Sequence, residues 1–167
     1  MKKSILAVMM VSNLLISVAA NPKSEEPKKA SEKLAHQVIV ALRLSSSSDF
    51  INLMPTLEEF KHIMKKNESV YGSHLVEAQE DFTTTYETTI LPAVKESFKV
   101  LTEDGIKRGI NWQEITLVRV ESEENQLFHA APITIVIASE GKEFKILIDK
   151  ALLINGQWKV SQFVKLV

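Results

Sequence analysis

The apolar positions of this chain change their spacing once, near Gly109. Before Gly109 they recur every three or four residues, as on one face of a helix, and after it they alternate, as in a strand with one buried face. The pattern predicts helices in the first part of the chain, at 31–44, from 57 onward and over 73–102, and strands at 110–121, 131–139, 143–154 and 157–167. Helices first and an antiparallel meander last indicate an α+β domain.

The second predicted helix carries a recognisable start. Thr56 can cap the helix, and Glu59, three residues later, can reach back to the amide of the cap. Leu57, Phe60 and Met64 then recur at helical spacing and predict the apolar face of a short helix.

The stretch from Phe82 to Ile90 fits two structures. Its apolar residues continue a helical spacing that begins at Leu75, but the same residues also alternate, and their many threonines favour a strand. We expect a helix because of the continued spacing, and the strand stays open as the alternative. Pro92 is expected to kink this helix or to start another, and Gly105 is expected to end it.

Two short turns set the register of the predicted sheet. Glu140-Gly141 and Asn155-Gly156 suit two-residue hairpins, which place Leu153 opposite Trp158, Ala151 opposite Val160 and Asp149 opposite Gln162. The buried positions then change parity near Asp149 on one strand and near Gln162 on its neighbour. Two paired strands that switch at one level indicate a bulge, so we expect a curved four-stranded antiparallel sheet with the helices on its concave side.

The first twenty residues have the pattern of a secretory signal peptide. Lys2 and Lys3 precede an apolar run from Ile5 to Val18, and small residues follow at 18–20. We expect cleavage, with a periplasmic or secreted product and no membrane span afterwards; an uncleaved anchor is the competing interpretation. Residues 21–31 are polar with two prolines and predict a flexible tether, which leaves 32–167 as a single domain.

Composition excludes several classes of site. The sequence has no cysteine, so it holds no disulfide framework and no thiolate metal site. Cleavage would leave 18 basic against 21 acidic side chains, a net charge of −3, and we find no basic cluster interleaved with aromatics. We therefore expect no nucleic-acid partner. No phosphate loop or nucleophile motif occurs, and we expect neither a cofactor nor a metal.

The closing segment 153–160, Leu-Ile-Asn-Gly-Gln-Trp-Lys-Val, resembles the last hairpin of many exported members of the nuclear-transport-factor-two-like superfamily, within the broader cystatin-like class. With the helices before a curved sheet, the resemblance covers about 31–167. It implies a cone of helices over a bent sheet, often with a pocket between them. Members include enzymes, ligand binders and interaction modules, so the resemblance does not select a function. The Gln-x-Val-x-Gly signature of true cystatins is absent.

Four residues are candidates to line such a pocket: Asp149, Gln162, Tyr86 and Trp158. A carboxylate buried beside Gln162 could gain a raised pKa and accept a proton, and Tyr86 could donate to a developing oxyanion, as the isomerase members of the superfamily suggest. The alternative is that the bend exposes Asp149, or that Gln162 and Lys150 satisfy it. The aromatic residues are equally consistent with plain core.

A second group, His74, Glu77 and Asp81, lies on one face of a predicted helix. These residue types can bind metal ions, but their spacing matches no known motif, and an ordinary solvated helix face explains it.

These observations favour an exported, non-enzymatic binding or interaction module for a small apolar ligand or an envelope protein. One alternative is a small isomerase- or hydratase-like enzyme with Asp149 as base and Tyr86 as donor. Another is a structural dimerisation domain that forms a homodimer through its sheet.

Overall fold

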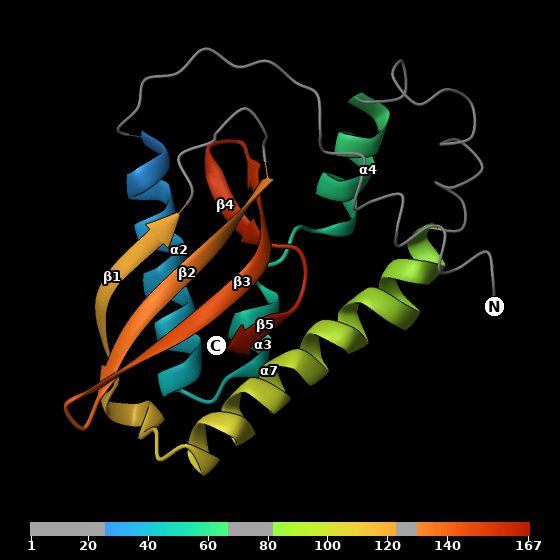
Figure 1. Ribbon diagram of the computed structural model, residues 1–167. Helices are drawn as coiled ribbons and strands as arrows, with labels where there is room; N and C mark the ends of the chain where they lie inside the picture. Colours follow the sequence, from blue (N-terminus) through green and yellow to red (C-terminus); the bar gives the residue numbers. More distant parts are fainter. Residues whose placement is uncertain (1–25, 67–81, 123–129) are drawn as a thin grey trace.

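The computed structural model describes residues 26–66, 82–122 and 130–167 (Figure 1). Its helices are α2 (Glu26–Arg43), α3 (Ser47–Ile51), α4 (Leu57–Lys66), the π-helix η1 (Tyr86–Ile90), α7 (Leu91–Lys107) and the 3-10 helix η2 (Trp112–Glu114). Its strands are β1 (Thr116–Ser122), β2 (Ala130–Ser139), β3 (Lys142–Ile154), β4 (Gln157–Val160) and β5 (Val164–Leu166). The α+β class is confirmed, with helices before an antiparallel sheet.

The sheet has the order β1-β2-β3-β4, and β5 pairs with β3 beyond the end of β4. Both hairpin turns have the predicted register, with Ser139 opposite Lys142 and Ile154 opposite Gln157. Their central residues, at 140–141 and 155–156, all have positive φ, as this turn type requires. The register next to both hairpin turns was thus predicted correctly from the sequence. The first predicted strand, 110–121, is wrong at its start, because Trp112–Glu114 form η2 and β1 begins only at Thr116.

A bulge interrupts the last predicted strand. β3 pairs with β4 as far as Ala151 opposite Val160, and with β5 from Ile148 opposite Val164. Between these pairs, the three residues 161–163 face the two residues 149–150 of β3. The register of β2 and β3 shifts at the same level, between Ala131 and Ile133. The predicted bulge is confirmed, but the single strand 157–167 is wrong, because the bulge divides it into β4 and β5.

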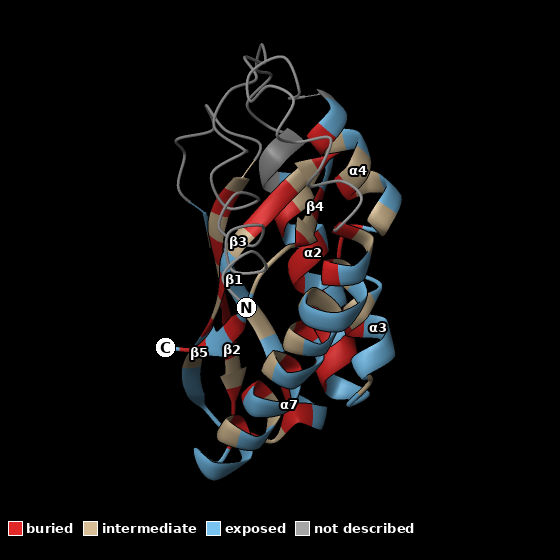
Figure 2. Cartoon of the chain, turned by 90° about the vertical axis from the view of Figure 1, so that its right-hand side faces the viewer, coloured by how far each residue is buried: buried red, intermediate tan, exposed pale blue. Residues whose placement is uncertain are grey.

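The helices α2, α3 and α7 cover one face of the sheet, which Figure 2 shows from its edge. The isoleucines that this face presents on β2 and β3 are fully buried: Ile133, Ile135, Ile137, Ile146 and Ile148. Phe50 of α3 and Phe98 of α7 pack over them, with ring centroids 4.8 Å apart. We call this the main cluster. Its side chains fill the space between helices and sheet.

The tip of the β3–β4 hairpin is buried on both faces. Ala151 and Trp158 belong to the main cluster, whereas Leu152 and Ile154 point to the opposite side and pack with α4 and Phe82. This second cluster comprises Phe60, Met64, Phe82, Leu152 and Ile154. In Figure 1 the hairpin tip lies between α2 and α4. α4 thus joins the fold through a different set of contacts from the other helices.

The opposite face of β1, β2 and β3 carries charged residues. Arg119 forms ion pairs at 2.9 Å with Glu121 and Glu143, and Lys145 lies 3.1 Å from Glu121. The hydrogen bond from Lys145, and then that from Arg119, holds the pKa of Glu121 below its ordinary value. Val136 is fully buried between its register partners Arg119 and Lys145.

Two expectations about helix ends need correction. α2 begins at Glu26, and Ser31 is already 1 % exposed, so the expected flexible tether over 21–31 is wrong from Glu26 onward. The predicted signal peptide lies outside the described residues. α7 continues past Gly105 to Lys107, and the left-handed Gly109 follows its end, with φ 81°. Gly105 lies inside the helix, and Trp112 packs against it.

The residues from Phe82 to Ile90 are helical, which settles the alternative in favour of the helix. Their last turn is wide, because the N–H of Leu91 donates to the carbonyl of Tyr86, five residues back. Pro92 has no N–H to give to Thr88, so an ordinary α-turn cannot form there. The proline therefore accounts for the π-helix that precedes α7.

The short helix α3 has no counterpart in the sequence-based interpretation. Ser46 caps it by accepting a hydrogen bond from the N–H of Asp49, and Phe50 anchors it in the main cluster. Among the described residues, no helix is both long and apolar enough to cross a membrane.

Candidate functional site

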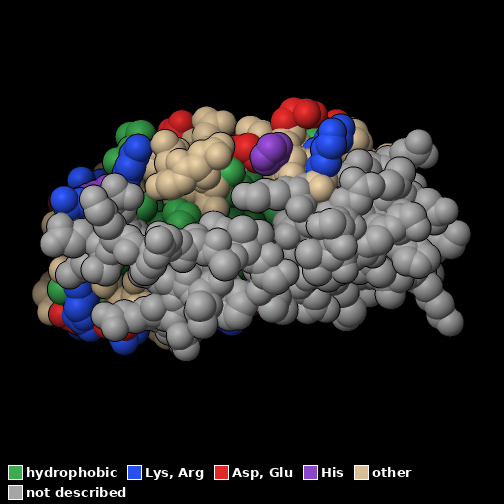
Figure 3. Space-filling model, turned by 90° about the horizontal axis from the view of Figure 1, so that it is seen from above, with side chains coloured by type: hydrophobic (Ala, Val, Ile, Leu, Met, Phe, Trp, Pro, Cys, Tyr) green, Lys and Arg blue, Asp and Glu red, His purple; other side chains and the backbone are tan. Residues whose placement is uncertain are grey.

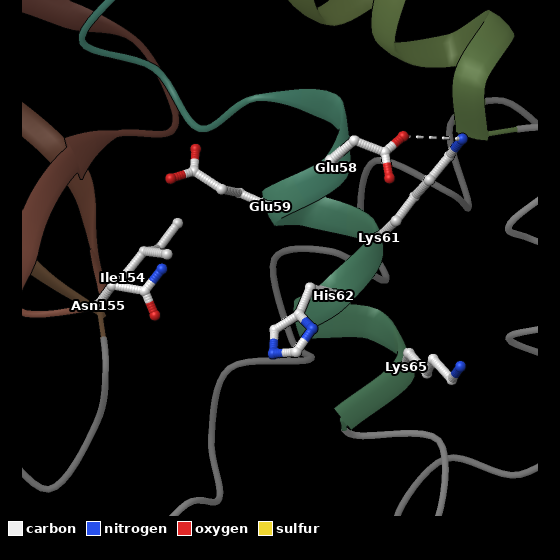
Figure 4. A pocket seen from close by; sticks show the side chains of 7 residues that line it. All are labelled: Glu58, Glu59, Lys61, His62, Lys65, Ile154 and Asn155. Atoms are coloured by element: carbon white, nitrogen blue, oxygen red, sulfur yellow. Dashed lines mark ion pairs between the residues drawn. The ribbon is translucent and has the colours of Figure 1, made fainter.

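A hollow of about 650 Å³ opens beside α4, on the side of the β3–β4 turn. We call it the α4 hollow. Its lining residues are Glu58, Glu59, Lys61, His62 and Lys65 of α4, with Ile154 and Asn155 of the hairpin. In Figure 4 the side chains of Glu59 and His62 extend toward Ile154 and Asn155. Its volume is that of a small-molecule site, although it is open to solvent.

Local rules place these side chains. The N–H of Thr56 donates to Glu59 Oε2 at 2.7 Å, and the N–H of Glu59 donates to Thr56 Oγ1 at 3.2 Å, so the predicted capping box is confirmed. The box starts α4, and Phe60 and Met64 bury its opposite face. The charged face of α4 is thereby turned toward the hollow.

The two carboxylates of the hollow already have partners. Glu58 lies 3.6 Å from Lys61, one turn along α4. Glu59 lies 3.6 Å from Lys159 of β4, with side chains 26 % and 19 % exposed respectively, in addition to its capping bond. Each acid thus has a lysine at 3.6 Å, although the Glu58 pair is exposed and therefore weak.

The nitrogen-bearing side chains of His62, Lys65 and Asn155 are not engaged in this way. Within the part of the chain that the structure describes, none of the three forms an ion pair or a side-chain hydrogen bond. Figure 3 shows acidic, basic and histidine side chains together on the part of the upper face that is not grey. The hollow therefore offers three hydrogen-bond donors that have no partner among the described residues, and one of them, Lys65, is a cation.

Asp149 and Gln162 both lie at the bulge, but not as a direct pair. The N–H of Asp149 donates to the carbonyl of Phe163 at 3.3 Å, and the N–H of Ser161 donates to the carbonyl of Lys150 at 3.1 Å. Gln162 is thus the additional residue of the bulge, and its predicted register opposite Asp149 is wrong. The side chain of Asp149 is exposed, as the alternative interpretation expected. Burial lowers the pKa of the neighbouring Lys150 amine.

Tyr86 and Trp158 lie on opposite faces of the hairpin tip. Trp158 is 6 % exposed and belongs to the main cluster. Tyr86 packs against Phe60 of the second cluster, with ring centroids 5.9 Å apart, and its hydroxyl donates to the carbonyl of Pro55 at 3.0 Å. Burial, and then the charge of Glu59, raises the pKa of Tyr86. The structure does not bring the four predicted residues into one pocket.

No protein family, curated protein or solved structure matches the chain. Within the described ranges, no group of histidine and acidic side chains is arranged to hold a metal ion. The sequence-based candidates His74, Glu77 and Asp81 lie outside those ranges.

None of His62, Lys65 and Asn155 was predicted from the sequence to be a site residue, and Asn155 served there only to place a turn. One signal was present in the sequence. Residues 151–154 read Ala-Leu-Leu-Ile, an unbroken apolar run that is typical of a strand buried on both faces. That run indicates that something covers Leu152 and Ile154, and the apolar face of α4 is the element that does so.

Proposed function

We propose that this chain is an exported, non-enzymatic binding module whose ligand occupies the α4 hollow. The observation that carries the proposal is a ligand-sized hollow in which the carboxylates are paired while His62, Lys65 and Asn155 remain available. The predicted signal peptide supports export. The order of helices and the bent sheet support the resemblance to the nuclear-transport-factor-two-like superfamily.

The geometry favours a polar ligand beside α4 over an apolar one inside the cone. The inner sheet face is filled, since its isoleucines are fully buried beneath Phe50 and Phe98. The isomerase alternative needs Asp149 and Tyr86 in one cavity, but Asp149 is exposed and Tyr86 packs in the second cluster. Neither residue lines the α4 hollow.

The test is native mass spectrometry of the protein purified from the exported fraction of its own host. We expect a mass that begins at Asn21, with an additional bound mass in the wild type. His62→Trp would fill the hollow and should remove the bound mass, whereas Lys99→Trp, at an exposed site on α7, should retain it. A wild-type protein without a bound mass, or equal retention by both variants, would contradict the proposal.

A further inference from the structure

We infer that the ligand of the α4 hollow is a small organic anion, in which a carboxylate or another oxyanion is attached to a compact apolar group. The inference rests on the proposed function and names the chemistry of its ligand. Three features of the hollow point to it: both acids have a lysine at 3.6 Å, three donors have no partner among the described residues, and Ile154 supplies an apolar edge.

The acids of the hollow would not repel such an anion strongly. Glu58 has Lys61 at 3.6 Å, and Glu59 has both Lys159 at 3.6 Å and the N–H of Thr56 at 2.7 Å. A cationic ligand would have to compete with these lysines for the same carboxylates. It would thus gain little by entering.

The available groups are donors. An ammonium group has three N–H donors and no acceptor, an imidazole donates from at least one nitrogen, and a side-chain amide donates from its NH₂. Lys65 and His62 of α4 and Asn155 of the β3–β4 turn supply these groups among the residues that line the hollow, although in Figure 4 the side chain of Lys65 projects away from Asn155. Hydrogen bonds from such donors to an ionised oxygen are stronger than bonds between neutral groups. The hollow is therefore matched to an oxyanion.

The apolar part of the ligand has a defined place. Ile154, the apolar residue among those that line the hollow, is 8 % exposed at the edge of the second cluster. A short aliphatic chain could cover this edge while its anionic end reaches the donors. The volume of about 650 Å³ has room for a small molecule.

The experiment is a titration of the intact mature protein, followed by backbone amide chemical shifts in NMR. The probes are hexanoate, hexyl phosphate, inorganic phosphate and hexylammonium. We expect saturable shifts at residues 58–65 and 154–156 with hexanoate or hexyl phosphate, weaker effects with inorganic phosphate and none with hexylammonium. Whichever of hexanoate and hexyl phosphate binds more tightly identifies the oxyanion.

Variants separate charge from shape. Lys65→Gln and His62→Gln should each weaken hexanoate binding by roughly three- to fivefold, the scale of an exposed charge interaction. Lys99→Gln removes an exposed lysine of α7 and should have no effect. The inference would be overturned if hexylammonium bound as tightly as hexanoate. It would also be overturned if neither Lys65→Gln nor His62→Gln changed the binding of hexanoate.

The two proposals fail separately. If both hexanoate and hexyl phosphate leave the hollow unperturbed while the co-purified mass still depends on His62, the ligand class is wrong and the binding function stands. If neither the binding of these probes nor the co-purified mass depends on His62, the site itself is wrong.

Discussion

Trp112 is held by a close contact with a glycine. Its indole N–H donates to the carbonyl of Thr102 at 2.9 Å, and its ring lies against Gly105. The N–H of Ile110 donates to the carbonyl of Gly105 at 2.8 Å, and that of Gly109 to Ile106 at 3.0 Å, which closes the end of α7. The glycine at 105 therefore serves packing, and the glycine at 109 serves the turn.

Gly105→Ala should destabilise the protein although alanine is the better helix former. The added methyl carbon would lie 2.6 Å from Trp112 Cε2, which forces the ring or the helix to shift. We expect a loss of about 1–3 kcal/mol in the free energy of unfolding, the usual cost of overpacking. Urea denaturation measures this loss.

A second substitution identifies the cause of that loss. In the background of Trp112→Phe, whose ring is smaller, Gly105→Ala should cost clearly less than it does alone. Lys107→Ala, at an exposed position in the same helix, should be nearly neutral. Additive effects of the two substitutions at 105 and 112 would show that the contact is not the reason.

Tyr86 gives a pH-dependent effect on stability. Tyr86→Phe removes the hydrogen bond to the Pro55 carbonyl and should cost about 1 kcal/mol at neutral pH. The folded protein raises the pKa of Tyr86 above 10.0, so the stability supplied by the protonated hydroxyl is complete below about pH 10 and is lost as the pH rises through the folded pKa.

The stability gap, the difference in the free energy of unfolding between wild type and Tyr86→Phe, should therefore narrow above pH 10, because phenylalanine does not ionise. Urea denaturation of both proteins at neutral pH and at about pH 10.5 measures it. Lysine titration is common to the two proteins and cancels in the comparison. A gap that stays constant or widens would show that burial does not favour the neutral hydroxyl.

At the scale of elements, the start of α4 depends on one hydroxyl group. Thr56→Ala removes the acceptor for the N–H of Glu59 and should lower the stability of α4 by about 1 kcal/mol, whereas Thr56→Ser keeps the acceptor and should resemble the wild type. Amide hydrogen exchange at Glu59 and Phe60 measures the change. Equal exchange in both variants would mean that the cap contributes nothing.

The elements also show which structures a sequence can specify alone. The hairpins and the bulge were predictable because a period of two and a two-residue turn leave one register. The position of the π-helix was not, since it depends on how Pro92 continues an already formed helix. α3 was missed because its signal is short, and Phe50 gains its role from contacts with residues far along the chain, such as Phe98.

At the scale of the whole molecule, the second cluster was the least predictable feature. The apolar face of α4 was correctly predicted, and the apolar run at 151–154 is visible in the sequence, but their meeting depends on the bend at the bulge. The four predicted pocket residues do not lie together for the same reason. The bend and the additional residue, Gln162, leave the side chain of Asp149 exposed to solvent. Long-range placement of this kind is not encoded in local periodicity.

The two clusters should open with different free energies. Met64→Ala should reduce the exchange protection of α4 and leave the amides of β2 nearly unchanged, whereas Ile135→Ala should lower protection everywhere. Each side chain is at most 3 % exposed, so each substitution should cost about 2–5 kcal/mol in its own unit. Native-state hydrogen exchange at low urea concentrations measures both. Uniform loss of protection in Met64→Ala would show a single cooperative unit.

The outermost strand, β1, pairs with β2 alone in the described sheet, and a free strand edge is a template on which another chain can add. Here the register shifts between Leu117 and Arg119, so Val118 is an extra residue that breaks the edge into two short runs. Arg119 and Glu121 add charge beside the break. Cross-β growth needs a flat and continuous strand, and β1 offers neither. The irregularity in β1 thus protects the protein from edge-to-edge aggregation when many copies are crowded together.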